Sequence, residues 1–143
     1  MAIPRSRHPA ERSVPRALTG PPSWHTVPVA QLPNLRVGVC TDVAHAIVRL
    51  DGELDIASSG PLVQHLSGLL SRGYTQIVID LTHLVFCDAA GLGALVRAGR
   101  LAAARGGWLR LASTQPRLVR IMNLAHLTGA LPGYQTTQDA LAG

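Results

Sequence analysis

Two short stretches of the sequence hold the side chains that could carry chemistry. In the first, Asp51, Glu53 and Asp55 form an acidic cluster that is followed by Ser58 and Ser59. A serine becomes a nucleophile only when a base is placed to take its proton, and we find no histidine or acid so placed. The serines fit helix N-caps better. The carboxylates are either solvated loop residues or binding residues.

The second stretch begins at Asp88 and contains closely spaced glycines. Gly91 and Gly93 open a G-x-G-x-x-G pattern, in which backbone N–H groups hold a phosphate, but its last position is Val96. The chain also lacks the G-x-S-x-G turn that carries the nucleophile of α/β hydrolases. We therefore expect neither a standard nucleotide-binding loop nor an enzyme.

Histidine and cysteine, the usual ligands of transition metals, are scattered. None of the six histidines stands at metal-ligand spacing from another, and the two cysteines do not form a C-x-x-C pair. We expect no metal and no cofactor. Cys87 is interpreted as a small packed residue where a strand meets a helix, and so few cysteines fit a reducing cytoplasm.

Length and charge limit the classes of protein to which the chain could belong. With 143 residues, 47% of them hydrophobic, the chain is long enough for one folded domain. No apolar run approaches the roughly 20 residues that span a bilayer, so membrane insertion is not expected. All 13 basic residues are arginine, typical of GC-rich coding, and the net charge is +5. With one Phe, two Trp and two Tyr to stack on bases, direct binding of nucleic acid is not expected.

Residues 1–34 differ from the rest in composition. They contain seven of the ten prolines, and four arginines against one glutamate give them most of the net charge. We expect a mostly disordered arm over residues 1–34, either a solvated tail or a partner-binding segment. The folded domain is then expected over residues 35–143.

From residue 35 onward, the hydrophobic pattern predicts strands. Alternation predicts one strand over 35–40 and a second over 44–50, closed by a turn at Asp51-Gly52. A β-branched run predicts a strand over 76–81 that is buried on both faces, and alternation predicts another over 108–112.

Helices are expected between and after these strands. The first starts at Ser58-Ser59 and ends at Gly73, and the others run over about 88–105, 115–127 and 136–142. The outer face of the second helix carries Arg97, Arg100 and Arg105, which are either solvated or contact an acidic partner. The order ββαβαβαα predicts an α/β domain with a mixed sheet of four to five strands.

An ordered set of motifs spans most of this domain. It reads Gly52-Glu53-Leu54-Asp55, then Asp80-Leu81, then Val85-Phe86-Cys87-Asp88-Ala89-Ala90-Gly91-Leu92-Gly93, and later Pro116-Arg117-Leu118-Val119-Arg120. The set resembles the STAS domain of bacterial anti-sigma factor antagonists, in which G-E-L-D, D-L and F-hydrophobic-D-S-[ST]-G-[LV]-G follow one another. The resemblance covers about residues 35–143.

The resemblance implies a cytoplasmic protein-binding module that is not an enzyme. It implies a partner, an anti-sigma factor with a kinase-type ATPase domain, whose capture frees a sigma factor for transcription. In the family that kinase phosphorylates the Ser or Thr just before the glycine of the last motif, and phosphorylation breaks the complex. Here that position is Ala90, and the preceding serine is replaced by Ala89. We therefore expect this switch to be absent.

The resemblance also places the partner-binding residues, which are Asp55, Asp88, Ala89, Ala90, Gly91 and Leu92. Structural roles remain open for two of them, because Asp88 fits a helix N-cap and Gly91 fits close helix–sheet packing. Two alternative functions are also open. One is a STAS subunit or scaffold that docks on another ATPase, such as that of a lipid-transporter complex, and the other is a small α/β ligand-binding domain.

Overall fold

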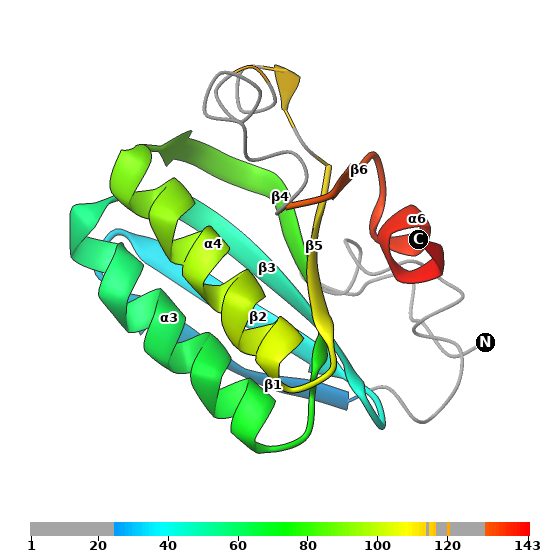
Figure 1. Cartoon of the computed structure of the whole chain (residues 1–143). Coiled ribbons are helices and arrows are strands. Elements are labelled where there is room, and N and C mark those ends of the chain that lie inside the picture. The colour runs from blue at the N-terminus through cyan, green and yellow to red at the C-terminus, as the bar shows by residue number, and fades with distance from the viewer. Residues whose placement is uncertain (1–24, 114, 117–119, 121–130) are drawn as a thin grey trace, which may run out of the picture.

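The computed structural model describes residues 25–113, 115–116, 120 and 131–143. They form a mixed six-stranded sheet in which the strands lie in chain order (Figure 1). The first three strands are antiparallel, and the third to the sixth are parallel. The predicted α/β class and mixed sheet are confirmed, with six strands where four to five were expected. The elements are β1 (His25–Leu32), β2 (Leu35–Thr41), β3 (His45–Leu54), α3 (Ile56–Ser71), β4 (Gln76–Cys87), α4 (Ala89–Ala104), β5 (Trp108–Ala112), β6 (Gly133–Tyr134) and α6 (Thr137–Ala142).

The edge strand β1 lies inside the segment for which the sequence predicts a disordered arm, and that prediction is wrong for residues 25–32. Val27, Ala30 and Leu32 pack against the core. A register shift between Val27 and Ala30 places Pro28 at a bulge, where its missing N–H is tolerated. The folded domain therefore begins before residue 35, and residues 1–24 lie outside the described part of the chain.

β3 and β4 run further than their apolar segments predict. β3 continues through Gly52 to Leu54, where the sequence predicts a closing turn, and β4 continues to Cys87. Their parallel pairing reaches Leu54 opposite Cys87, with two irregularities of register on the way. The extended ends bring the acidic cluster and the start of α4 to the same edge of the sheet.

The main core lies between the sheet and the two long helices, which cover one face side by side (Figure 1). Alternation along β4 directs Ile77, Ile79 and Leu81 into this core, whereas Val78 belongs to a separate cluster on the other face. Each fully buried Leu or Ile contributes about 1.5–3 kcal/mol. Burial in this layer therefore holds both helices against the sheet. The helices contribute the fully buried side chains Leu62, Leu66, Leu70 and Leu95.

The short helix α6 packs on the opposite face of the sheet. Ala140 joins a small cluster with Val78 and Ala112. The guanidinium of Arg110 lies 3.7 Å from the ring centroid of Trp108 and donates a hydrogen bond of 2.9 Å to the carbonyl of Ala140. A stacked cation thus holds α6 in place.

In the described part of the chain, each helix of the structure corresponds to a helix that the sequence predicts. The helix expected over 136–142 is confirmed, whereas the one expected over 115–127 falls almost entirely outside the described residues. No helix in the described part of the chain is both long enough and apolar enough to cross a bilayer.

Candidate functional site

Asp55 and Asp88 immediately follow two paired strands and begin the two long helices. Leu54 of β3 and Cys87 of β4 are partners in the parallel ladder. Asp55 directly follows Leu54 in the sequence, and Asp88 directly follows Cys87. Asp55 is the N-cap of α3, and Asp88 is the N-cap of α4. The two acidic caps therefore lie beside each other at one edge of the sheet, as expected for the carboxyl ends of parallel strands.

The carboxylate of Asp55 is held by several donors. Its Oδ1 accepts from the backbone N–H of Ala57 at 2.9 Å and of Ser58 at 3.1 Å, and its Oδ2 accepts from Nδ2 of Asn34 at 3.1 Å. Desolvation acts to raise the pKa of the Asp55 carboxyl, but the hydrogen bonds from Asn34, Ser58 and Ala57 outweigh it and lower the pKa. Asp55 is thus an ionised, fixed acceptor at this edge.

Asn34 is a site residue that the sequence did not indicate, because it fell within the predicted arm. It occupies the turn between β1 and β2 with φ of 61°, a conformation that asparagine tolerates. Its carbonyl accepts from the N–H of Glu53 at 2.8 Å. A Cβ on Gly52 would come within 2.5 Å of that carbonyl oxygen, and Gly52 has φ of 124°. The glycine before Glu53 is therefore required for the turn to dock beside Asp55.

Asp88 performs the structural role that its residue type predicts. Its Oδ1 accepts from the N–H of Gly91 at 2.8 Å, and its own N–H donates to the carbonyl of Leu54 at 3.3 Å. A Cβ on Gly91 would lie 2.5 Å from the Leu54 carbonyl oxygen and 2.9 Å from Sγ of Cys87. Close packing of α4 on the ends of β3 and β4 therefore requires glycine at this position.

Ser58 and Ser59 are not the N-caps that the sequence predicts. The N-cap of α3 is Asp55, three residues before Ser58. Ser58 is the third residue of the helix and forms a capping box with Asp55. Oγ of Ser58 accepts from the N–H of Asp55 at 2.9 Å and donates to the carbonyl of Glu53 at 3.0 Å. Oγ of Ser59 donates to the carbonyl of Asp55. Both serines are buried, so their hydroxyls serve the cap.

Large apolar side chains are exposed beside the two caps. Ile56, the first residue of α3, is 82% exposed, and Phe86, two residues before Asp88, is 46% exposed. The neighbouring Ala89 is exposed and Ala90 is half-buried. The sequence patterns missed Ile56 and Phe86 because an apolar residue is by default assigned to the core. We call the set Asp55, Ile56, Phe86, Asp88, Ala89 and Ala90 the rim surface.

The predicted binding residues divide into two groups. Asp55 and Asp88 are half-buried, and with Ala89 and Ala90 they reach the surface. Gly91 and Leu92 are buried, Leu92 within the main core. These two residues position the start of α4 and present no side chain to a partner.

The two thiols are unsuited to nucleophilic or redox chemistry. Burial, reinforced by the charge of Asp88, raises the pKa of Cys87 to about 12, and burial with the charge of Asp42 raises the pKa of Cys40 to about 11. Both therefore stay protonated near neutral pH. The described residues also contain no group of three His, Cys, Asp or Glu side chains that could hold a metal ion.

Comparisons with known proteins agree with this fold. A protein-family model described as STAS domain matches residues 38–140. The anti-sigma F factor antagonist of Paenibacillus polymyxa is 30% identical over 96 residues, which are 66% of this chain and 82% of that protein.

Several solved structures share the fold. An anti-sigma factor antagonist from Mycobacterium paratuberculosis superposes with a TM-score of 0.67 at 24% identity, covering 79% of this chain and 97% of its own. An anti-sigma factor antagonist (STAS) domain protein from Planctomyces limnophilus gives 0.63 at 18% identity, covering 74% and 95%. The overlap extends over nearly the whole of both solved chains.

Proposed function

Because the chain belongs to the STAS domain family, we propose that it is a non-enzymatic regulator that captures an anti-sigma factor in the cytoplasm and so controls sigma-factor-dependent transcription. The matched relatives bear the name of anti-sigma factor antagonists. The observation that carries the proposal is the rim surface, where exposed apolar side chains stand next to two acidic helix caps.

The rim surface has the composition of a protein-binding patch. Ile56 and Phe86 offer apolar area that a partner can bury, and Asp55 and Asp88 supply charge at its margin. Protein interfaces commonly combine an apolar centre, which contributes most of the affinity, with a polar rim that sets orientation. The hydrogen bonds that fix both carboxylates mean that little side-chain freedom is lost on binding.

The partner that we propose has a kinase-type ATPase domain, and the complex lacks the phosphorylation switch of the family. Ala89 and Ala90 have no hydroxyl at the start of α4. Ser58 and Ser59, the nearest serines along the other cap, are buried with their hydroxyls in the capping network. A phosphate adds roughly −1.5 to −2 charge at neutral pH, and the rim surface itself includes no serine or threonine to receive it. Thr82, further back on β4, is exposed, but its hydroxyl donates to Oδ1 of Asp80. The antagonist is then active regardless of the kinase.

Binding through the rim surface is tested by calorimetric titration of the full chain against the anti-sigma factor that co-purifies with it. Ala90→Asp places a charge in the contact and is expected to weaken binding by at least about tenfold. Ile56→Ser removes apolar area and is expected to weaken binding as well. Val43→Ser is the matched control, because Val43 is 89% exposed at the β2–β3 turn, away from the rim. Equal affinities of wild type and Ala90→Asp, with both folded, would refute the proposed surface.

The kinase character of the partner is tested by restoring a hydroxyl. With the partner and ATP, the wild-type chain is expected to take up no phosphate, whereas Ala90→Ser is expected to take up one phosphate at residue 90. Mass spectrometry of both proteins measures the result. An unmodified Ala90→Ser chain would exclude a kinase acting at this position. Near-complete phosphorylation of the wild type would show that the switch has moved to another residue.

A further inference from the structure

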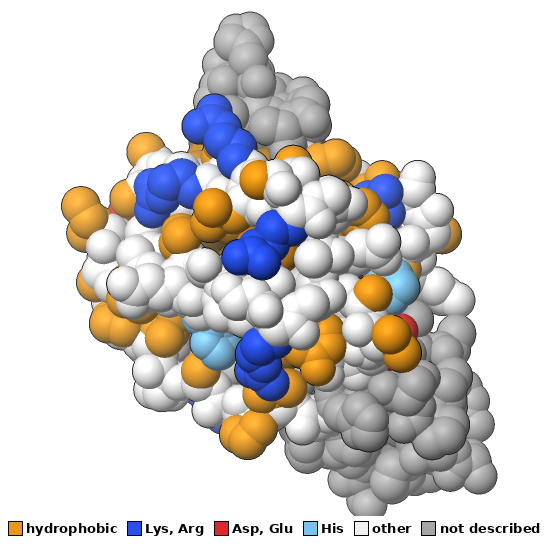
Figure 2. Space-filling view, turned by 60° about the horizontal axis from the view of Figure 1, so that its bottom comes forward, with side chains coloured by type: hydrophobic (Ala, Val, Ile, Leu, Met, Phe, Trp, Pro, Cys, Tyr) orange, Lys and Arg blue, Asp and Glu red, His pale blue; other side chains and the backbone are white. Residues whose placement is uncertain are grey.

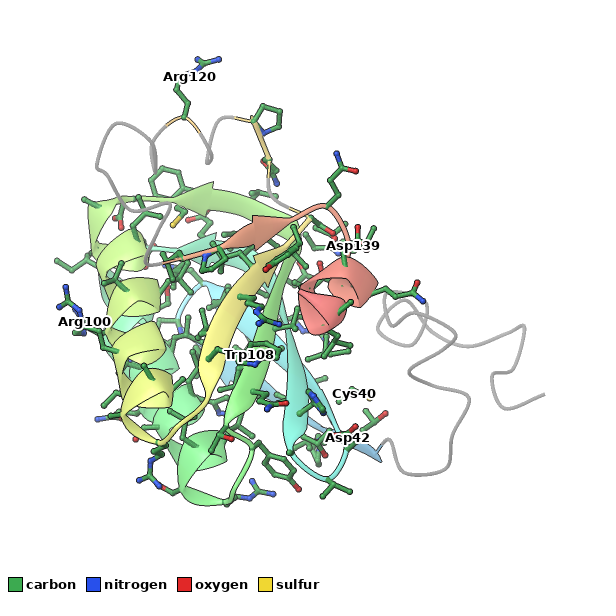
Figure 3. All side chains as sticks on the ribbon, turned by 45° about the vertical axis from the view of Figure 1, so that its right-hand side comes forward. Cys40, Asp42, Arg100, Trp108, Arg120 and Asp139 are labelled. Atoms are coloured by element: carbon green, nitrogen blue, oxygen red, sulfur yellow. The ribbon has the colours of Figure 1, made fainter. Side chains whose placement is uncertain are left out.

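The exposed face of α4 carries a row of basic side chains that the rim surface does not use. Arg97, Arg100 and Arg105 are exposed, and Leu101 between them is 40% exposed. At 3.6 residues per turn these four positions share one side of the helix. In Figure 3 the side chain of Arg100 points away from α4 and from the sheet.

Beyond the N-caps Asp55 and Asp88, the two long helices contain no acidic residue to balance these charges. Neither Ile56–Ser71 nor Ala89–Ala104 includes an Asp or Glu. In the part of the chain that the structure describes, Arg97 and Arg100 make no ion pair. Figure 2, in which the lower side of Figure 1 comes forward, shows several basic side chains spread over that side with very little acidic surface among them. This face is therefore a region of uncompensated positive charge.

Local structure accounts for the arginines at the helix ends and not for those in the middle of α4. Arg72 and Arg105 are the C-caps of α3 and α4, where a cation is stabilised by the helix dipole, and Arg72 also lies 5.8 Å from the ring of Tyr74. Arg97 lies two turns before the end of α4 and Arg100 directly before its last turn, so neither is among the end positions at which the dipole is strongest. These two guanidiniums have no evident role in the fold.

Gly93 leaves the surface of α4 open one turn before Arg97. A Cβ on Gly93 would meet only Nη1 of Arg97, at 3.8 Å, so the guanidinium extends back over the glycine, toward the start of the helix. The positive charge of Arg97 thus lies along the surface of α4, over Gly93.

We propose that this face of α4 docks an acidic helical segment of a partner protein, with Arg97 and Arg100 binding its carboxylates and Leu101 contacting an apolar side chain. Arginine pairs with carboxylates in a bidentate geometry, and α4 offers about 24 Å of length to a helix lying along it. The face has no aromatic side chain on which a base could stack, which favours a protein over single-stranded nucleic acid. The proposal does not depend on the identity of the protein that binds the rim surface.

The probe is a fluorescent 16-residue helical peptide with Glu at every third or fourth position and one Leu on the same side, compared with its Gln counterpart. Fluorescence anisotropy with the full-length chain is expected to show binding of the Glu peptide, weakened by about tenfold or more in Arg97→Gln/Arg100→Gln. Arg36→Gln is the matched control for the single variants Arg97→Gln and Arg100→Gln, because Arg36 is exposed on β2 and each of the three substitutions removes one positive charge. Binding is expected to weaken several-fold between about 50 and 300 mM salt.

Three results would overturn the proposal. The first is equal affinity of the Glu peptide for wild type and the double variant, with circular dichroism showing both folded. The second is an equal loss in Arg36→Gln, which would indicate a diffuse charge effect. The third is tighter binding of duplex DNA or of anionic vesicles than of the peptide, lost in the same double variant. That result would assign the face to a nucleic acid or to a lipid surface instead. Leu101→Ser is expected to weaken binding of the Glu peptide without changing how that binding depends on salt concentration.

Discussion

The side chain of Asn34 donates a hydrogen bond of 3.1 Å to Oδ2 of Asp55, although 21 positions separate the two residues. The bond joins the β1–β2 turn to the N-cap of α3, two elements that the sequence alone gives no reason to connect. The Asp55 end of the rim surface is therefore held in place by the turn between β1 and β2.

Asn34→Ala is expected to raise the pKa of the Asp55 carboxyl toward its ordinary value of 3.8, because a donor to the charged form is lost. A folded-state pKa below the unfolded value stabilises the protein above the unfolded pKa, and this contribution is lost as pH falls through the folded pKa. The variant should therefore lose stability at neutral pH and show a smaller further loss on acidification. A carboxyl titration followed by NMR measures the pKa; an unchanged value would show that the bond does not form in solution.

Gly91→Ala is expected to destabilise the fold by about 1–3 kcal/mol, as overpacking does, because its Cβ would lie 2.5 Å from the Leu54 carbonyl oxygen. Gly93→Ala, two residues along the same helix, meets nothing closer than 3.8 Å and should stabilise it by about 0.5–1 kcal/mol through helix propensity. Urea unfolding of both variants gives the comparison. Similar shifts of the two midpoints would contradict the packing of α4 on β3.

Asp88→Ala is expected to cost about 1 kcal/mol, because the N–H of Gly91 loses its cap. Asp88→Asn keeps an oxygen acceptor and should cost much less, so the pair separates the cap from the charge. If Asp88→Asn weakens the binding of the partner while the urea midpoint stays near that of the wild type, the charge itself contributes to binding. Equal midpoints for wild type and Asp88→Ala would show that the cap contributes nothing to stability.

Removal of residues 1–24 is expected to leave the unfolding midpoint nearly unchanged, whereas removal of residues 1–34 should lower it. The longer deletion takes away β1, whose Val27 and Leu32 pack on the core, and also Asn34. Thermal unfolding followed by circular dichroism compares both truncated chains with the full chain. If the two deletions have the same effect, β1 contributes nothing to the stability of the domain.

The thiols of Cys40 and Cys87 are expected to react with a disulfide reagent at pH 8 at least about tenfold more slowly in the folded protein than in urea, because the reactive species is the thiolate. Burial raises the pKa of both thiols, to about 11 and about 12 respectively. Absorbance of the released thiolate gives the rates. Rapid reaction of Cys87 in the folded protein would mean that its packing against Gly91 opens readily.

Local sequence patterns predicted those elements whose structure depends on residues close together in the chain. The β-branched run at Gln76 predicted the buried start of β4, and the aspartate at position 88 predicted the cap of α4. The start of α3 was predicted three residues late, because Ser58 and Ser59 are good caps by type but the capping box with Asp55 takes precedence.

The parts that were missed depend on contacts between distant residues. Pairing with β2 and packing on the core outweigh the proline-rich composition around β1. Exposure of Ile56 and Phe86 follows from where α3 begins and β4 ends in space, and the hydrophobic periodicity of the sequence does not contain that information. The same holds for Asn34, which contributes to the site only because Gly52 lets its turn approach β3.

The bulge at Pro28 also interrupts the free edge of β1, along which another copy of this chain could pair. β1 is the outer strand of the sheet, and an outer strand with a continuous row of free N–H and C=O groups recruits strands from other molecules. Pro28 offers no donor, and the register shift beside it breaks the row. The bulge therefore works against edge-to-edge stacking of copies along β1.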